Sequence, residues 1–422
     1  MLFFRAASGL MPEFLSPPLS HAVRDVVTEE AAILPPRGAA LHLTPLVSEG
    51  DLVAKGSPVA CLRNAPDVCL VAPIAGRVAR VARSASRRIS EIVLFREDAG
   101  GTERRDVTAS DSPNGLRRLM QSAGIWPWIR RRPFGGMPGA DERPSAIVVI
   151  AADTDPDAVA PNVDLKGRHE AFARGIAALA TLADGLVLVA WPDGEPKPDL
   201  DVTGTEIGWI ACGPRHPQGA AGICIHRHAP AGTDAPVWDI HAEDVAELGD
   251  LLATGELPQR RLVRLSGAAL GESRTVRTHP GADLRQLTQR IVNRSPHEVR
   301  TGSHLDGRPA RWLGQRDRQV TVLPREALPE PVHWLRAALD NSNRADPAIP
   351  SAALSQAFGS ALPAAPFIRA LASGDEEAAI RFGVLSLLEE DISLADYVLG
   401  ANGALKGQLR AMLDRIQSEY EG

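Results

Sequence analysis

Side chains that can ligate a metal ion are concentrated in the middle of the chain. They are His216, Cys224, His226, His228 and His241. The apolar run 223–225 predicts a short strand, along which His226 and His228 alternate and therefore share a face. A zinc or iron site needs converging ligands at short, fixed spacing, and no cysteine or carboxylate continues this pattern. We therefore favour polar histidines at strand ends over a metal site, and we assign no metal ligand.

Two carboxylates follow a strongly apolar stretch. Residues 146–151 (AIVVIA) read as a parallel strand covered on both faces, and Asp153 and Asp155 come directly after it. Ligands of open α/β sheets bind beyond the carboxyl ends of such strands. A carboxylate pair could perform acid–base chemistry. Such residues more often cap a turn or a helix, so we assign no catalytic residue.

Tryptophans and arginines lie side by side in the sequence W-P-W-I-R-R-R-P-F. Trp126 and Trp128 precede Arg130, Arg131 and Arg132. Guanidinium groups here could face an anionic partner or stack on a ring. We favour the alternative, which is a solvated arginine face over half-buried tryptophans.

Several cofactor motifs are absent from the sequence. The four cysteines, Cys61, Cys69, Cys212 and Cys224, form no C-x-x-C pair, which argues against an iron–sulfur cluster. Disulfides remain open, although a large, cysteine-poor chain is typical of cytosolic proteins. The glycines at 213, 219 and 222 lack the spacing of a dinucleotide fingerprint, and residues 400–406 are not a P-loop. The residues that would bind a cofactor are therefore unknown.

Composition narrows the class of protein. The chain has 422 residues, 44% of them hydrophobic, and a net charge of −6. An acidic chain of this kind argues against nucleic-acid binding. The most apolar window, 175–191, is interrupted by Asp184 and is shorter than the roughly 20 residues that a membrane-spanning helix needs. The first residues are too briefly apolar for a signal peptide, so we expect neither a membrane span nor a signal peptide, and residues 1–34 resemble a leader or a strand-plus-turn segment wrapped on the next domain.

The order of patterns predicts an α/β, mixed α+β multidomain chain. Its segments are an N-terminal extension (1–34), a barrel-sandwich hybrid domain (35–98), a linker with one helix (99–143), a second α/β domain with a mainly parallel sheet (144–258), a small α/β module (259–326) and a mostly helical C-terminal domain (327–422). In the second segment, E-G-D-L-V-A-K-G followed by A-P-I-A-G-R-V resembles lipoyl and biotinyl domains. Their carrier lysine lies at a hairpin tip. Here the tip, 64–68, contains no lysine and Lys55 lies in an earlier turn, so we expect a scaffold.

Helical spacing is clearest after residue 240. Val245, Leu248 and Leu251 share one face, Asp244 and Glu247 lie on the other, and a glycine at 255 ends the pattern. Further helices are predicted over 172–182, 281–291, 367–373, 376–388 and 405–420.

Taken together, the ordered motifs resemble a known family, the A subunit of the sodium-translocating NADH:quinone oxidoreductase. The matching pieces are G-x-x-H-P-x-G-x-x-G-x-x-x-H at 213–226, V-W-D-I at 237–240, D-V at 244–245 and G-D-L-L-A-T-G-E-L at 249–257. A-x-D-T, R-x-R-P-F and L-x-E-E-D elements elsewhere also fit. Residues 259–326 resemble the SLBB module, a soluble ligand-binding β-grasp, of the same family.

The resemblance implies a peripheral subunit on the cytoplasmic face of the bacterial inner membrane. Its complex passes electrons from NADH to quinone and couples them to Na+ export. NADH and flavins are expected on the integral-membrane and flavin-bearing partner subunits, and this chain is expected to support quinone reduction and assembly without its own redox centre. Contact with ubiquinone is one option. The alternatives are a component of another flavin or quinone complex, a stand-alone protein of that kind, and a cofactor-free interaction scaffold.

Three departures from the family stand out. Ala269 replaces the threonine that carries covalent flavin in related membrane subunits, so no covalent flavin is expected there. Val384, Asp396 and Leu399 stand in or near positions where the family has cysteines. Residues 401–406 replace the signature C-P-G-K-Y-x-x-G, and the first 34 residues diverge.

Overall fold

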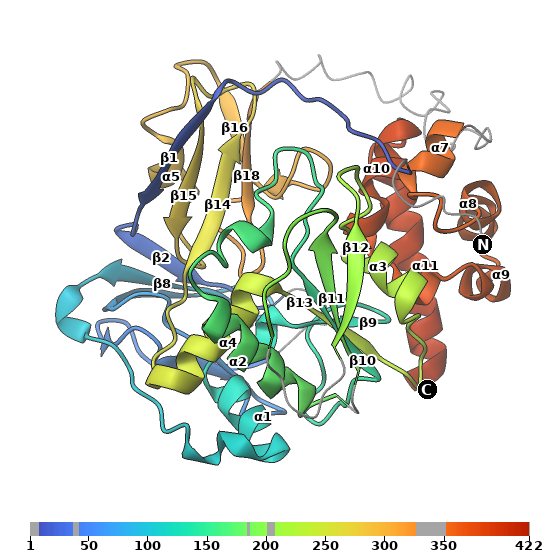
Figure 1. The fold of residues 1–422 in the computed structure, drawn as a ribbon. Coiled ribbons are helices and arrows are strands. Elements are labelled where there is room, and N and C mark those ends of the chain that lie inside the picture. The colour runs from blue at the N-terminus through green and yellow to red at the C-terminus, as the bar shows by residue number, and fades with distance from the viewer. Residues whose placement is uncertain (1–7, 37–41, 184–185, 201–206, 326–351, 422) are drawn as a thin grey trace.

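The computed structural model describes residues 8–36, 42–183, 186–200, 207–325 and 352–421. Four sheets and one group of helices pack together. In Figure 1 the strands between residues 30 and 96 lie at lower left, a six-stranded sheet at upper left, a five-stranded sheet in the centre and the C-terminal helices at right.

Two small facing sheets form the barrel-sandwich hybrid domain that the sequence predicts. One has the order β2-β8-β7-β4 and the other β3-β5-β6. Their bounds are β2 (Glu30–Ile33), β3 (Leu43–Pro45), β4 (Leu52–Val53), β5 (Pro58–Leu62), β6 (Cys69–Val71), β7 (Gly76–Arg83) and β8 (Ile89–Arg96). Alternating residues of both sheets, among them Val59, Leu70, Val78 and Leu94, fill the core between them.

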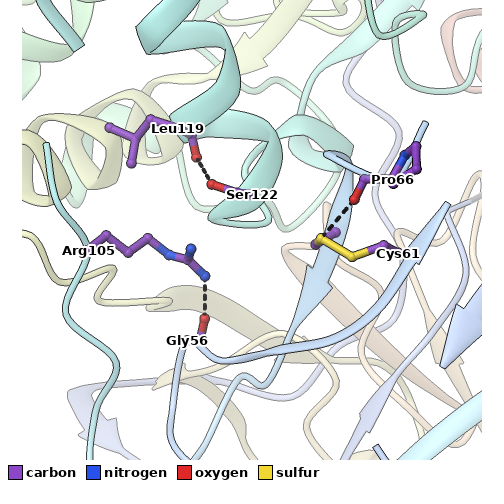
Figure 2. The surroundings of a disulfide bond; sticks show 7 residues. Gly56, Cys61, Pro66, Arg105, Leu119 and Ser122 are labelled. Atoms are coloured by element: carbon purple, nitrogen blue, oxygen red, sulfur yellow. Dashed lines mark hydrogen bonds between the residues drawn. A yellow bond between two sulfur atoms is a disulfide. The ribbon is translucent and has the colours of Figure 1, made fainter. Parts of the chain in front are cut away.

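The hairpin between β5 and β6 is closed by a disulfide. Cys61 and Cys69 are directly opposed across the two strands and are bonded to each other. Figure 2 shows the bond beside the end of helix α1 (Pro113–Ser122). In the same view Arg105 Nη2 donates to the carbonyl oxygen of Gly56 at 2.8 Å, which ties the following segment to this domain. The disulfide, which the sequence leaves open, thus closes the tip where carrier domains place their lysine.

A five-stranded sheet with the order β12-β11-β10-β13-β9 forms the centre of the molecule. Its strands are β9 (Arg130–Arg132), β10 (Ala146–Ile150), β11 (Val187–Pro192), β12 (Ile207–Cys212) and β13 (Val237–His241). All pairings are parallel except that of β9 with β13. Ile147 and Val149 pack toward α2 (His169–Ala180) and α4 (Ala242–Thr254), whereas Val148 packs toward α3 (Ala221–His228). The predicted parallel strand, covered on both faces, is confirmed.

The strand predicted at 223–225 is wrong, because Ala221–His228 is helix α3. A short apolar run cannot distinguish a strand from a buried helix by periodicity alone. Ile223 and Ile225 are buried, and the Asp391 carboxylate accepts the N–H of Gly222 at 2.7 Å in the first turn. Residues two apart on a helix do not face each other, so His226 and His228 do not share a face.

A six-stranded sheet with the order β1-β15-β14-β18-β16-β17 lies above and to the left of the central five-stranded sheet in Figure 1. Its strands are β1 (Leu19–Asp25), β14 (Arg261–Ser266), β15 (Ser273–Thr278), β16 (His297–Thr301), β17 (Arg308–Pro309) and β18 (Gln319–Pro324). Helix α5 (Leu284–Thr288) begins after Asp283, whose carboxylate accepts the N–H of Arg285. Strand β1 comes from the segment predicted as an extension, and the chain before it crosses the top of Figure 1 to reach the C-terminal helices.

The described C-terminal residues are helical. The helices are α7 (Ala352–Ala357), α8 (Ala364–Ser373), α9 (Glu376–Arg381), α10 (Ser393–Val398) and α11 (Ala404–Glu421). The helix predicted over 376–388 is too long: α9 ends at Arg381, and Gly383, at a φ of 95°, turns the chain into short 3-10 segments. Within the described ranges, no helix combines the length and the apolar character that crossing a bilayer requires.

Candidate functional site

A cavity of about 170 Å³ lies at the carboxyl ends of β10 and β13, where ligands of α/β sheets bind. We call it the inner chamber. Three parts of the chain enclose it: the five-stranded sheet, the loops that flank β17 and the turn before α10. Its lining comprises Arg130, Ile150, Asp153, Asp155, His216, Gly219, Ala220, Ala221, Asp239, His241, Gly302, Ser303, Asp306, Arg316, Asp317, Arg318, Gln319, Glu390 and Asp391.

The two carboxylates singled out in the sequence both line this chamber. Asp153 Oδ1 accepts the N–H of Asp155 at 2.9 Å, which is the turn-capping role expected from sequence. Enclosure by protein raises the pKa of Asp153 to about 6. Enclosure, followed by the neighbouring Asp153, raises the pKa of Asp155 well above its ordinary value. Both carboxyls are therefore protonated at a higher pH than free aspartate side chains are.

A third carboxyl group, Asp306, enters the chamber from the loop before β17. Its Oδ1 accepts the backbone N–H of Ser303 at 2.8 Å and the hydroxyl of Ser303 at 2.7 Å. Asp306 is exposed at the cavities it lines, yet desolvation by the surrounding protein raises its pKa. No sequence motif marks this residue, because it lies in an irregular loop.

Two histidines of the chamber each have an unpaired ring nitrogen. His216 is only 4% exposed, and its Nδ1 lies 3.4 Å from both Thr154 Oγ1 and Asp155 Oδ1, while its Nε2 has no hydrogen-bond partner. Burial lowers the pKa of His216 to about 4. Burial, reinforced by Arg316 and Arg318, holds the pKa of His241 well below its ordinary value, and its Nδ1 is also unpaired. Both rings are therefore neutral at physiological pH.

The predicted solvated arginine face is wrong for Arg132, which is fully buried. Its guanidinium forms an ion pair with Asp239 of β13 and another, at 3.0 Å, with Asp391. A buried charge needs such partners. The neighbouring Arg130 donates to Glu390 at 3.0 Å. Trp126 and Trp128 are buried rather than half-buried. The L-x-E-E-D element thus supplies partners for the arginine cluster.

A second ionic network lies behind the chamber, on the face of α4 predicted to be polar. Arg318 binds both carboxylate oxygens of Asp244, at 2.8 and 2.9 Å, and Glu243 at 2.5 Å. Arg261 pairs with Asp244 at 3.1 Å and with Glu247 at 3.6 Å. These groups are buried, because α4 is covered on this side by the six-stranded sheet. The network joins helix α4 to the six-stranded sheet.

A larger cavity of about 540 Å³, which we call the outer cleft, adjoins the inner chamber. One part of its wall is apolar and includes Pro35, Pro127, Ile129, Phe134 and Met137. Another part is basic and includes Arg308, Lys406 and Arg410. The two cavities share Arg130, Asp306, Arg316, Asp317 and Glu390. This volume and mixed lining are typical of small-molecule sites.

The remaining sequence candidates lie elsewhere. His226 and His228 are not in either cavity, and across the described ranges no three His, Cys, Asp or Glu side chains form a group that could hold a metal ion. The buried thiols of Cys212, at the end of β12, and Cys224, in α3, lie 3.9 Å apart. Burial is the main cause of the lowered pKa of Lys55, whose backbone pairs with Thr102.

Two of the family departures have structural roles here. Val384 is buried in the helical core. Asp396 is 4% exposed, and it accepts the N–H groups of Gly403 at 2.7 Å and of Leu405 at 3.0 Å. It therefore caps the start of α11.

Comparison with known proteins agrees with this architecture. Residues 15–97 match the model of the NqrA N-terminal barrel-sandwich hybrid domain, and residues 112–257 match the model of the NqrA second alpha/beta domain. The A subunit of the Na(+)-translocating NADH-quinone reductase from Rhodopirellula baltica is 30% identical over 98% of this chain and 98% of its own length. The corresponding protein of Pasteurella multocida is 29% identical over 96% of this chain and 98% of its own. The corresponding protein of Neisseria meningitidis is 31% identical over 92% of this chain and 94% of its own length. The chain therefore belongs to the A-subunit family of the Na+-translocating NADH-quinone reductase.

Proposed function

We propose that this chain is a peripheral subunit on the cytoplasmic face of the bacterial inner membrane. Its complex transfers electrons from NADH to quinone and couples that transfer to Na+ export. The chain supports quinone reduction and assembly, while NADH and flavins bind to integral-membrane and flavin-bearing partner subunits. The observation that carries this proposal is the near full-length match to A-subunit relatives, 98% of both chains in one case.

The outer cleft supports a direct contact with quinone. Its apolar wall would accommodate a ring, and its basic groups could donate hydrogen bonds to carbonyl oxygens. The cleft lies where the barrel-sandwich domain, the central sheet and the C-terminal helices meet, because Pro35, Ile129 and Lys406 all line it. A ligand there would touch three parts of the chain at once.

The cysteine positions agree with a chain that lacks its own redox centre. Cys61 and Cys69 are bonded to each other, and Cys212 and Cys224 are free thiols 3.9 Å apart in a different core. The four thiolates of an iron–sulfur cluster therefore have no common position among the residues described here.

The test begins with membranes from the source bacterium in which this gene is deleted. We expect NADH-quinone reductase activity and its stimulation by Na+ to be lost, and to return when the tagged chain is expressed. The tagged chain should also co-purify with multi-span and flavin-bearing subunits in mild detergent. Unchanged activity in the deletion, or a tagged chain that purifies alone, would contradict the proposal. A lone yellow protein would indicate a stand-alone flavoprotein, and a lone colourless one an interaction scaffold.

A further inference from the structure

The inner chamber contains carboxyl groups whose charges are not neutralised. Among the described residues, no lysine or arginine forms an ion pair with Asp153, Asp155 or Asp306. The arginines of the chamber are committed elsewhere: Arg316 lies 2.5 Å from Asp239, and Arg318 binds α4. Asp153 and Asp155 are partly buried and Asp306 is exposed at the cavities it lines, so partial desolvation and the mutual repulsion of the carboxylates, rather than complete burial, favour the protonated form.

The surroundings of the three carboxyls add to this tendency. Glu243, Glu390 and Asp391 face them from α4 and the turn before α10, and these acidic groups oppose further negative charge. Arg318 acts in the opposite direction on Asp153, but burial outweighs it. The neutral His216 contributes no charge, and its unpaired Nε2, on a ring that is only 4% exposed, lies in the chamber wall.

Asp306 connects this proton-holding group to the outer cleft. It is the carboxyl of the three that lines both cavities, whereas Asp153 and Asp155 line the inner chamber alone. A ligand in the outer cleft would therefore meet Asp306 first. Asp155 Oδ1 and His216 Nδ1, which lie 3.4 Å apart, belong to residues that line the inner chamber.

We propose that Asp153 and Asp155 in the inner chamber, and Asp306 at its boundary with the outer cleft, hold exchangeable protons, and that Asp306 passes them to a quinone reduced in the outer cleft. This inference rests on the proposed function. Two electrons come from the reduced flavin of the partner subunits. For each proton, the O–H bond of the carboxyl breaks and an O–H bond forms on a quinone oxygen, so that quinone, two electrons and two protons give quinol. The carboxylates regain their protons from water.

The experiment uses the whole complex in membranes. Reduction of ubiquinone-1 needs electrons and protons, whereas reduction of ferricyanide needs electrons alone. We expect Asp306→Asn to lower the NADH:ubiquinone-1 rate at least tenfold, since general acid catalysis contributes roughly 10²–10⁴-fold, and to leave the NADH:ferricyanide rate unchanged. The double variant Asp153→Asn, Asp155→Asn should lose the fall in quinone rate that the wild type shows as pH rises from about 6 to 8. The control Asp157→Asn changes a carboxyl on the same loop as Asp153 and Asp155. Asp157 lines neither cavity, so this variant should behave as wild type.

The outcomes separate this inference from the proposed function. If deletion of the chain leaves quinone reduction intact, the proposed function fails and the inference fails with it. If deletion abolishes quinone reduction but the carboxyl variants keep the wild-type rate and pH profile, the inference alone is overturned. Should Asp306→Asn lose both activities, Asp306→Glu decides: recovery of quinone reduction supports proton transfer, and continued loss assigns the residue to folding and overturns it.

Discussion

Glu247 shows how burial and ion pairing compete at a single residue. It is fully buried, lies 3.6 Å from Arg261 and accepts the N–H of Arg260 at 2.5 Å. Burial raises its pKa to about 7 in spite of the arginine. The folded protein therefore binds this proton more tightly than the unfolded chain does.

This residue predicts a dependence of stability on pH. Because the folded-state pKa is raised, the contribution of Glu247 is fully present below pH 4.5 and is lost as pH rises through about 7. The loss amounts to about 3 kcal/mol, at roughly 1.4 kcal/mol per pKa unit. Glu247→Gln should remove this part of the pH dependence while keeping the bond to Arg260. Urea unfolding at pH 4.5 and pH 8 measures it, with the exposed Glu170→Gln as control. An unchanged pH dependence in Glu247→Gln would show that the carboxyl ionises without cost.

At the scale of elements, helices α2 and α4 approach closely through glycines. A Cβ on Gly249 would meet the backbone of Ala171, and one on Gly175 would meet the backbone of Val245. Neither helix could keep its place on the central sheet with larger residues there. Small side chains at this crossing are therefore required by packing rather than by backbone conformation.

The same substitution, glycine to alanine, can be compared at this crossing and at an open helical position. Gly249→Ala should destabilise the protein by about 1–3 kcal/mol, because the added methyl forces the helices apart. Gly407→Ala in α11 adds the same methyl where nothing lies within 4 Å, and should stabilise by up to about 1 kcal/mol through helix propensity. Thermal unfolding of both variants measures the difference. A neutral Gly249→Ala would show that the two helices can move apart freely.

Helices and strands whose patterns lie in neighbouring residues can be predicted from the sequence, whereas the lining of the inner chamber can be predicted only in part. Neighbouring residues determine the apolar run of β10 and the helical spacing of α4. They also determine the end of α4 at Gly255, which has a φ of 76°. The strand prediction fails at α3 because a short buried run suits either structure. The inner chamber combines Asp155, Asp306 and Glu390, which are far apart in sequence and lie in loops or turns. Loops carry no periodicity, so the sequence marks only part of the lining, namely Asp153, Asp155, His216, His241 and the arginine cluster.

At the scale of the molecule, Arg132 joins the central sheet to the C-terminal helices. It pairs with Asp239 on β13 and with Asp391, which also accepts the N–H groups of Gly222 and Leu388. Arg132→Met would leave the buried Asp391 without its cation and Asp239 with Arg316 alone, and should destabilise the protein by about 3–5 kcal/mol. The control Arg77→Met removes a pair that is 49% and 39% exposed, and should cost at most about 1 kcal/mol. Equal stabilities of the two variants in chemical denaturation would refute this role.

The N-terminal segment crosses the whole molecule to reach its partners. Gly9 donates to the side chain of Gln356, 347 residues later, at 2.6 Å, and strand β1 pairs with β15. A ribosome that adds roughly 5–20 residues per second therefore releases this segment tens of seconds before its last partner exists. Strand β1 likewise has no partner until β15 has been made, and an unpaired strand invites pairing with other chains. A segment that is made long before its partners is thus among the last to reach its place, and during that interval it is open to association with other chains.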